Sequence, residues 1–174
     1  MEVGGTNLLP DSNVASLTAV ACNGDRYFSD NTNTSITMEF INVTDAPLSA
    51  ITVGIRTTVT AITTEGKNLT WRNIPLTDGE TYTISYYARI TNGTQARLRF
   101  RYRVMGCTYT GGYQDFTNTT WAKVSYTFTV DKSKSTTDVN ASDLYGIGVA
   151  GVMGTYLGTI EMCGFKLEKG NKAT

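Results

Sequence analysis

One short segment of the sequence concentrates arginine at a regular spacing. Every second residue from 97 to 103 is an arginine: Arg97, Arg99, Arg101 and Arg103 alternate with Leu98, Phe100, Tyr102 and Val104. The period of two in a β-strand places all four guanidinium groups on one face. Such groups bind carboxylate, phosphate and polyol oxygens in pairs. The pattern indicates either a cleft for an anionic or phosphate-bearing glycan, or a solvated strand face whose arginines pair with carboxylates across the sheet.

Aromatic side chains offer a second kind of chemistry, because the C–H faces of sugar rings stack on aromatic rings. Trp71 lies in a segment that ends in Ile74-Pro75-Leu76. If Ile74 and Leu76 point inward, strand parity places Trp71 on the outer face of its sheet, where a ligand could lie. The alternative is a tryptophan that covers the edge of the sheet. Pro75 favours an edge strand, since it cannot donate to a hydrogen-bond ladder.

Tyr87 and Arg89 belong to a strictly alternating stretch, residues 81–90, and face away from its apolar positions. The following residues, Thr91-Asn92-Gly93-Thr94, are typical of a hairpin turn. We therefore expect the arginine-rich strand to lie beside this one. Tyr87 and Arg89 would then join the same strip of cations.

Residues 106–120 are predicted to form a long loop that carries Tyr109, Tyr113 and Phe116. Aromatic loop residues often contact partners; the alternative is a loop packed on its own aromatic rings. Trp121 opens the next predicted strand, and we expect it to pack in the core or at the edge. The candidate carbohydrate-binding residues are therefore Trp71, Tyr87, Arg89, Arg99, Arg101, Tyr109 and Tyr113.

The sequence gives no support for catalysis. It contains no histidine, which excludes Ser-His-Asp and Cys-His chemistry and imidazole metal sites. The spacing of the glutamates selects no catalytic pair, and no Gly-rich phosphate loop or metal cluster is visible. Cys22, Cys107 and Cys163 are far apart and are expected to be small buried residues, with one disulfide and one free thiol as the alternative. We expect a protein that is not an enzyme and binds no metal.

The bulk composition excludes further classes. A length of 174 residues fits one domain, residues 1–174. Zero formal net charge and a pI of about 6.2 argue against nucleic acid as a partner. No apolar run approaches the roughly 20 residues of a membrane helix, so no membrane partner is expected. The first residues, Met1-Glu2-Val3-Gly4-Gly5, do not read as a signal peptide.

Alternating segments separated by turn residues recur along the whole chain. They predict about nine strands, near residues 14–21, 36–40, 51–64, 68–76, 81–90, 97–104, 121–130, 144–150 and 156–167. Two sheets that bury alternate residues would supply one core. The predicted fold is all-β, a two-sheet antiparallel β-sandwich.

Four stretches resemble the galactose-binding-like jelly-roll domains that are related to carbohydrate-binding modules. Asn7-Leu8-Leu9 resembles their entry motif, and residues 76–88 resemble their central strand. Residues 121–128 resemble their late Trp-containing strand, and Phe165-Lys166-Leu167-Glu168-Lys169-Gly170 resembles their closing strand. The ending, residues 167–174, is similar to modules in tail and baseplate proteins of bacteriophages and prophages.

The resemblance implies a jelly-roll fold and a non-catalytic carbohydrate-binding module. The module would adhere to glycans of a bacterial cell surface as part of a phage tail, baseplate or receptor-binding protein. Its location would be the virion or the extracellular space, and other virion proteins or further copies of the chain would be additional partners. Two alternatives stay open: a structural or decoration module of a virion protein with no glycan ligand, and an accessory domain of a secreted polysaccharide-degrading enzyme.

The chain departs from the family pattern at one position. The family often places an Asp-Asp pair before the closing apolar residue, where one carboxylate helps to hold a structural calcium. Here the position reads Cys163-Gly164-Phe165. Calcium takes oxygen ligands, and cysteine and glycine supply no side-chain oxygen. We therefore expect no cofactor and a calcium site that is lost or weak.

Overall fold

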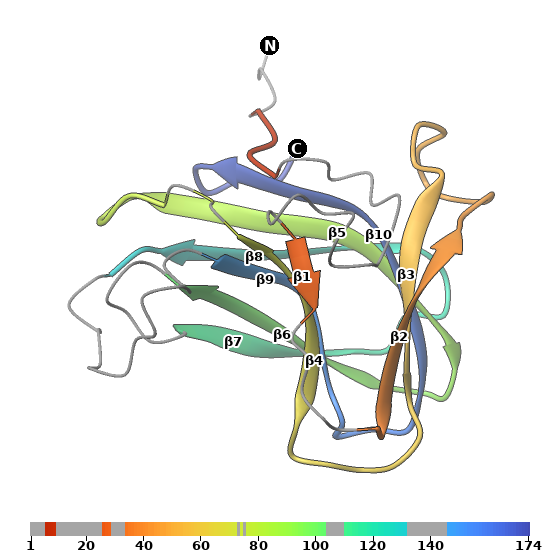
Figure 1. Ribbon diagram of the computed structural model, residues 1–174. Helices are drawn as coiled ribbons and strands as arrows, with labels where there is room; N and C mark the ends of the chain where they lie inside the picture. Colours follow the sequence, from red (N-terminus) through yellow and green to blue (C-terminus); the bar gives the residue numbers. More distant parts are fainter. Residues whose placement is uncertain are drawn as a thin grey trace.

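The computed structural model describes residues 6–9, 26–28, 34–72, 74, 76–103, 110–131 and 146–174. These residues form ten β-strands in two five-stranded antiparallel sheets (Figure 1). None of the described residues lies in a helix, and none therefore belongs to a helix that could cross a membrane. The predicted class, an all-β sandwich of two antiparallel sheets, is confirmed.

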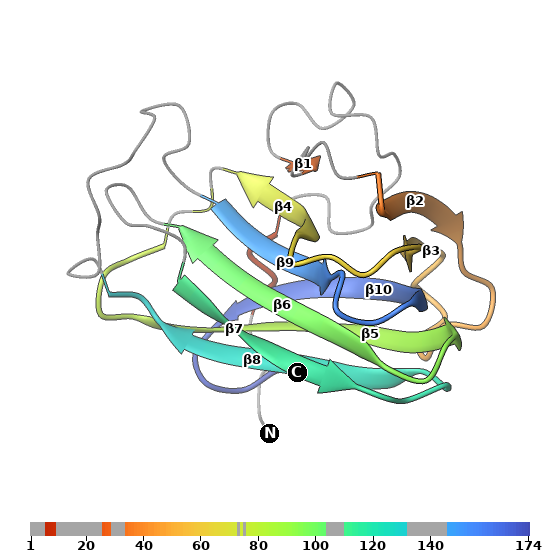
Figure 2. The ribbon, with the colours of Figure 1, turned by 90° about the horizontal axis from the view of Figure 1, so that it is seen from below.

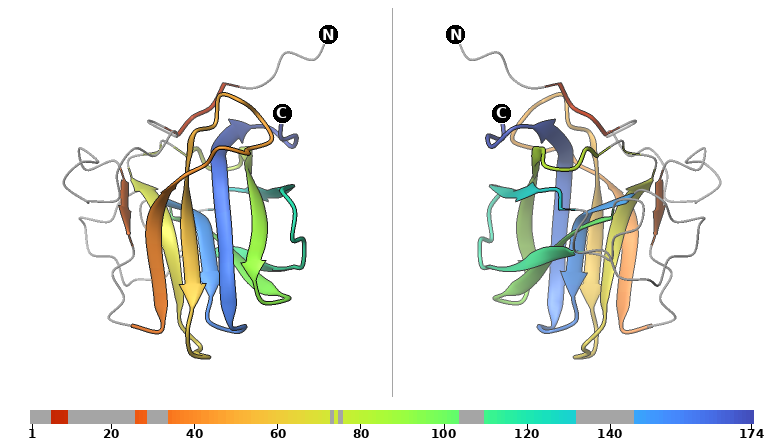
Figure 3. Two further views of the ribbon diagram at one scale, coloured as in Figure 1. Left: turned by 90° about the vertical axis from the view of Figure 1, so that its right-hand side faces the viewer. Right: turned by 90° about the vertical axis from the view of Figure 1, so that its left-hand side faces the viewer.

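The two sheets are named A and B. Sheet A has the order β1 (Arg26–Phe28), β4 (Gly66–Arg72), β9 (Gly146–Met153), β6 (Ala96–Arg103) and β7 (Thr110–Phe116). Sheet B has the order β2 (Ile36–Asn42), β3 (Val53–Val59), β10 (Gly158–Lys169), β5 (Thr81–Asn92) and β8 (Ala122–Thr129). The long strands β5 and β10 lie next to each other in the interior of sheet B (Figure 3).

The core lies between the sheets and is built from alternate residues of each strand. On β6, Leu98 and Phe100 are buried, and the arginines that alternate with them are on the opposite face. Rings from the two sheets meet in the core: Phe100 lies 4.7 Å from Tyr126, and Tyr102 lies 4.4 Å from Phe128, measured between centroids. Aromatic pairs of this kind add to the stabilisation from buried area.

The connection between β5 and β6 differs from the sequence prediction. Residues 91–94 were expected to form a hairpin within one sheet, but β5 belongs to sheet B and β6 to sheet A. At this crossing Gly93 has a φ of 92°, and a Cβ there would lie 2.8 Å from the carbonyl oxygen of Leu157. The site needs glycine for both reasons. Consequently β5 and β6 carry their outward side chains on opposite faces of the molecule.

Residues 106–120 were predicted to be a loop, and this is wrong for part of the segment. Strand β7 pairs with β6 from Tyr102↔Thr110 to Ala96↔Phe116, and Phe116 is buried. Its Gly111-Gly112 pair, which reads as a turn signal, lies inside an edge strand. The predicted strand near residues 14–21 lies outside the described residues, as do Cys22 and Cys107; Cys163 is buried, as expected.

Candidate functional site

The outer face of sheet A carries the arginines of β6. Arg97, Arg99 and Arg101 alternate with buried Leu98 and Phe100, so the predicted parity of this strand is confirmed. Figure 2 shows sheet A in front of sheet B, with β6 between β9 and β7. We call this surface, made of Arg97, Arg99, Arg101, Asn68, Tyr113 and Asp115, the arginine face.

Glycines of the neighbouring strands flank the arginines. Arg101 lies in register between Gly111 of β7 and Gly148 of β9. Arg99 lies between Tyr113 of β7 and Gly151 of β9. Because glycine has no side chain, the long arginine side chains can lie down over the neighbouring strands.

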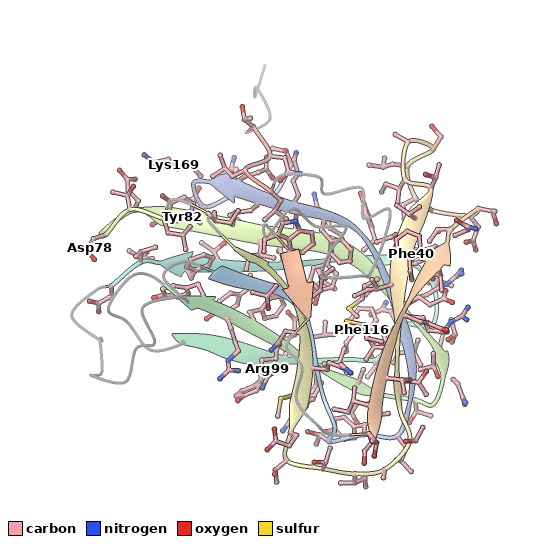
Figure 4. The ribbon with its side chains drawn as sticks, viewed as in Figure 1. Phe40, Asp78, Tyr82, Arg99, Phe116 and Lys169 are labelled. Carbon is pink, nitrogen blue, oxygen red and sulfur yellow. The ribbon has the colours of Figure 1, made fainter. Side chains whose placement is uncertain are left out.

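Arg99 uses this space. A Cβ on Gly151 would lie 3.1 Å from the Cβ of Arg99, and a Cβ on Gly66 of β4 would lie 2.9 Å from its Cζ. The side chain therefore crosses β9 and reaches β4 (Figure 4). There its Nε donates a 3.0 Å hydrogen bond to Oδ1 of Asn68, and only 8% of Arg99 is exposed. Asn68 fixes the guanidinium against the sheet; nothing in its sequence context pointed to this role.

Tyr113 and Arg97 complete the arginine face. Tyr113 is 64% exposed and lies opposite Arg99 in the β6–β7 register. Arg97 pairs with Asp115 at 2.8 Å, and this hydrogen bond holds the pKa of Asp115 below its ordinary value. The Arg97 guanidinium also lies 5.7 Å from the ring centre of Tyr156, an aromatic residue that the sequence reading did not select. The arrangement offers donors beside an exposed ring.

The outer face of sheet B carries a different arrangement, an alternating ladder of charges. Glu39, Arg56, Glu161 and Arg89 lie in register across β2, β3, β10 and β5. Glu161 accepts from Arg56 at 2.7 Å and from Arg89 at 2.9 Å, and only 5% of its side chain is exposed. We call these four residues the charge ladder.

Arg89 is fully engaged by its neighbours. Besides Glu161 it pairs with Asp45, and its guanidinium lies 4.4 Å from the ring centre of Trp121. Trp121 donates from Nε1 to the other carboxylate oxygen of Asp45 at 3.4 Å. The expected strip that joined Tyr87 and Arg89 to the β6 arginines does not form, because the two groups lie on different sheets. Trp121 packs at the edge of sheet B, as predicted, and on its outer side.

Trp71 is not on an outer face, so this orientation prediction is wrong. The side chain is 0% exposed, and its ring lies 5.6 Å from that of Phe165 in the core. Parity holds only within a strand, and β4 ends at Arg72. The N–H of Leu76 donates to the carbonyl of Ile74 at 2.9 Å, so the chain turns there and the parity of Ile74 says nothing about Trp71. A fully buried ring cannot stack on a ligand.

The remaining predicted residues are placed as follows. Tyr87 is half-buried on the outer face of sheet B, opposite Lys123 and Cys163. Tyr109 lies outside the described residues. The structure thus brings Arg99, Arg101 and Tyr113 together and places Tyr87 and Arg89 on the other sheet.

The residues at the position of the family calcium site do not fit that ion. Val43 and Cys163 both lie close to Gly54: a Cβ on Gly54 would lie 3.0 Å from the Cβ of Cys163 and 3.1 Å from Cγ2 of Val43. Ile51 packs over Gly164. Val43 and Ile51 are apolar, and the two carboxylates that act electrostatically on Cys163, those of Asp45 and Glu161, are both paired with Arg89. Calcium takes six to eight oxygen ligands. Among the described residues no cluster of three or more His, Cys, Asp or Glu side chains is placed to hold a metal.

Comparison with protein families identifies a matching family. A model of the family described as carbohydrate binding domain matches residues 29–142, which is more than half of the chain. No curated protein is similar enough to the chain to count as a match.

Several solved structures share the fold. The xylan-binding domain CBM22-1 of Paenibacillus barcinonensis Xyn10C superposes with a TM-score of 0.60 at 12% identity, over 99% of this chain and 100% of that chain. Arabinose-bound MgGH51 α-L-arabinofuranosidase gives a TM-score of 0.65 at 14% identity, and the bacteriophage CBA120 tailspike protein 4 gives 0.57 at 13%.

The last two proteins are much longer than this one. The chain is covered to 95% and 91% in these comparisons, but it spans only 26% of the arabinofuranosidase chain and 21% of the tailspike chain. At identities this low the likeness establishes the fold alone.

Proposed function

The chain belongs to the carbohydrate-binding domain family, and on that premise we propose that it binds glycans through the arginine face and catalyses no reaction on them. One observation carries the proposal: an exposed tyrosine, Tyr113, lies in register beside Arg99, on a sheet whose glycines leave room above the neighbouring strands. An exposed ring with fixed hydrogen-bond donors at its side is the arrangement that a sugar requires.

In the proposed mechanism the ring of Tyr113 and the arginines make different contacts with the glycan. The C–H face of one sugar unit stacks on Tyr113, while Arg101 and Arg97 donate to its oxygens. Arg99 is held by Asn68, so less conformational freedom is lost on binding. Among the side chains described on β6 and β7, this face carries the guanidinium groups of Arg97, Arg99 and Arg101 and the carboxylate of Asp115. That balance favours a glycan with carboxylate or phosphate groups over a neutral one.

We further propose that the glycan belongs to a bacterial cell surface and that the chain acts in a phage tail or another extracellular assembly. The similarity of the ending to phage tail modules and the shared fold with a phage tailspike support this setting. Weak single-site binding would be raised by many copies on one particle. Other virion proteins or copies of the chain would then be its protein partners.

A second setting has its own support. The arabinofuranosidase and a xylan-binding domain share the fold, so an accessory domain of a secreted polysaccharide-degrading enzyme is the competing proposal. The two settings differ in ligand. The first expects bacterial surface polymers, and the second expects the polysaccharide that the attached enzyme degrades.

A glycan array with bacterial cell-wall polysaccharides and plant polysaccharides tests the proposal. Tyr113→Ala and Arg101→Ala should each weaken binding at least about ten-fold, or about 1.4 kcal/mol. The control is Lys169→Ala, which removes one exposed cation from sheet B, on the side of the molecule away from Arg99 (Figure 4). Binding that survives both sheet A variants, or an array with no signal from a folded protein, would refute the proposed site. Signal confined to plant polysaccharides would select the second setting.

A further inference from the structure

A pocket of about 220 Å³ lies on the outer face of sheet B, on the side of the molecule away from the arginine face. We propose that it is a second binding site, which takes a single uncharged sugar ring. This site does not depend on the arginine face. We call it the bulge pocket, because β10 changes register against β5 between Cys163 and Lys166 beside it.

The bulge pocket is walled by strands and by one connection. Tyr87 of β5, Lys123 of β8 and Gly164 of β10 line it, together with Leu48 and Ile51 from the β2–β3 connection. The three strands pair with one another in the order β10, β5, β8. Their ladder therefore fixes the floor of the pocket.

One buried hydroxyl group at this floor is not used by the fold. On the outer side of β5, the hydroxyls of Thr81 and Thr83 each share a 2.9 Å hydrogen bond with the threonine opposite on β8. The next outward residue, Ser85, lines the pocket, is only 2% exposed and lies opposite Ser125. Within the described part of the chain, no hydrogen bond involves its hydroxyl. Buried polar groups are nearly always hydrogen-bonded, so a hydroxyl of a ligand is a suitable partner for Ser85.

The bulge gives the pocket its apolar part. Gly164 has a φ of 67°, and a Cβ there would lie 2.6 Å from Cδ1 of Ile51 and 3.3 Å from Cδ2 of Tyr87. Only glycine permits both the backbone conformation and this approach. The tyrosine ring and the Ile51 side chain therefore meet over Gly164, and Leu48, which is 54% exposed, extends the apolar wall. Bulges are frequent beside binding sites because they re-aim side chains in this way.

The ammonium groups beside the pocket are already engaged. Nζ of Lys166 pairs with the buried carboxylate of Glu168 at 3.1 Å, and Nζ of Lys123 donates to a main-chain oxygen of Thr174 at 2.8 Å. No described residue that lines the pocket has an acidic side chain. A charged ligand would therefore lose hydration without gaining an unpaired counter-charge, whereas an uncharged ligand avoids this cost.

Size and lining together select the ligand class. Pockets for drug-sized ligands measure roughly 300–1,000 Å³, so this one suits a single ring. One face of a sugar ring is made of C–H groups, which pack on Tyr87 and Ile51 while a ring hydroxyl bonds to Ser85. A purely apolar ligand would leave the Ser85 hydroxyl unpaired, and a uronic acid would bring a charge that the pocket does not match.

The test is an NMR titration of the ¹⁵N-labelled protein with the methyl β-D-glycosides of glucose, galactose, xylose and glucuronic acid. We expect at least one of the three neutral glycosides to shift the amide signals of Ser85, Tyr87 and Gly164. Measured at the same amides, the glucuronide should bind at least about ten-fold more weakly than the best neutral glycoside. Signals of β6 and β7 report separately on the arginine face.

Ser85→Ala and Ser125→Ala form a matched pair of variants. The two serines lie in register on β5 and β8, but Ser125 is exposed and does not line the pocket. Ser85→Ala should weaken binding of the neutral glycoside about three- to ten-fold, because one hydrogen bond to the ligand is lost. Its melting temperature should not fall, since the hydroxyl makes no bond within the described part of the chain. Ser125→Ala should change neither quantity.

The contrary outcomes are distinct. No shift at the three amides with any neutral glycoside, or equal affinities in Ser85→Ala and Ser125→Ala, would overturn the site. A glucuronide that binds at these amides as tightly as the neutral glycosides would overturn the uncharged ligand class. A lower melting temperature in Ser85→Ala alone would show that the hydroxyl serves the fold. Shifts confined to β6 and β7 would refute the bulge pocket and leave the arginine face, which the glycan array judges through Tyr113.

Discussion

Arg89 and Arg97 lie on opposite outer faces of the sandwich, although they are close in sequence, because the chain crosses from sheet B to sheet A between them. Their surroundings differ accordingly. Arg89 is held by Glu161, Asp45 and the ring of Trp121, inside a network that joins four strands. Arg97 forms an ion pair with the exposed carboxylate of Asp115 on the arginine face. The first arrangement stabilises the fold, and the second leaves a cation beside solvent.

The charge ladder predicts a stability defect in Glu161→Gln. The carboxylate is almost buried between Arg56 and Arg89, so neutralising it leaves two guanidinium groups without their central partner. Removal of one member of a buried pair costs about 3–5 kcal/mol, and the partial exposure of both arginines reduces this to about 2 kcal/mol. Urea denaturation measures the difference.

Asp115→Asn is the matched control for Glu161→Gln. It also removes the carboxylate of an arginine pair, but this pair is exposed, so little change in stability is expected. Equal losses of unfolding free energy in the two variants would show that the buried position of Glu161 in the charge ladder adds nothing to stability.

Substitution of the buried Trp71 is expected to lower the stability of the fold and to have no direct effect on glycan binding. Trp71→Ala should cost about 3–5 kcal/mol of unfolding free energy, and Trp71→Phe should cost less, because a ring still packs against Phe165. The chain has two tryptophans. Acrylamide should quench one of them, Trp121, and leave a protected fraction that disappears in Trp71→Phe. Uniform quenching of both would contradict the burial of Trp71.

Within a strand, the sequence alone was sufficient to predict which face a side chain occupies. The alternation of Leu98, Phe100 and Tyr102 with arginine correctly predicted which face of β6 is buried. Side chains of a strand alternate between its two faces, and the apolar ones face the core. The same reasoning failed when it was carried from Ile74 back to Trp71, because the chain leaves β4 at Arg72 and turns.

Relationships between strands could not be predicted in the same way. Turn residues such as Gly93 indicate where a strand ends, but they do not say whether the next strand pairs with it or crosses to the other sheet. Asn68 and Tyr156 were missed for a related reason. Their roles depend on strands that are far away in the sequence, and no local pattern marks them.

The titratable groups predict a plateau of stability at neutral pH. Burial acts to raise the pKa of Glu168, but hydrogen bonds from Thr174 and Lys166 outweigh it and leave the pKa below its ordinary value of 4.5. A carboxyl with a lowered folded-state pKa stabilises above its unfolded pKa and loses this effect as pH falls. With no histidine in the chain, stability should change little between about pH 5.5 and 8 and decline below about pH 4.5.

At alkaline pH the stability is expected to decline because of Cys163, whose pKa is raised in the folded state. Burial raises the pKa of the Cys163 thiol from 9.0 to about 12. The unfolded state therefore releases this proton first, and stability should decline as pH rises above about 9. Thermal denaturation across the pH range measures both limbs. Glu168→Gln should flatten the acid limb, and a transition near pH 6.5 would contradict the scheme.

Calcium should have no effect on stability. Ile51 packs over Gly164, and the carboxylates of Asp45 and Glu161 near Cys163 are paired with Arg89, whereas an ion would need several oxygen ligands. A ligand that binds only the folded state raises the melting temperature. We therefore expect equal melting temperatures in excess calcium and in EDTA. A rise with calcium that EDTA reverses would show that other oxygens supply a site.

Asn68 should act on the arginine face through Arg99. Its side-chain oxygen accepts the 3.0 Å hydrogen bond from Nε of Arg99, and both residues are buried. Asn68→Ala should lower the unfolding free energy by about 1–3 kcal/mol, because the guanidinium loses a partner where water cannot fully replace it. It should also weaken glycan binding, although Asn68 is too deeply buried to present itself to a ligand. A double-mutant cycle with Arg99→Lys separates the two effects: we expect a coupling of about 0.5–3 kcal/mol in stability. If the two substitutions are additive, or if Asn68→Ala leaves affinity unchanged while stability falls, Asn68 supports the sheet and does not position Arg99 for binding.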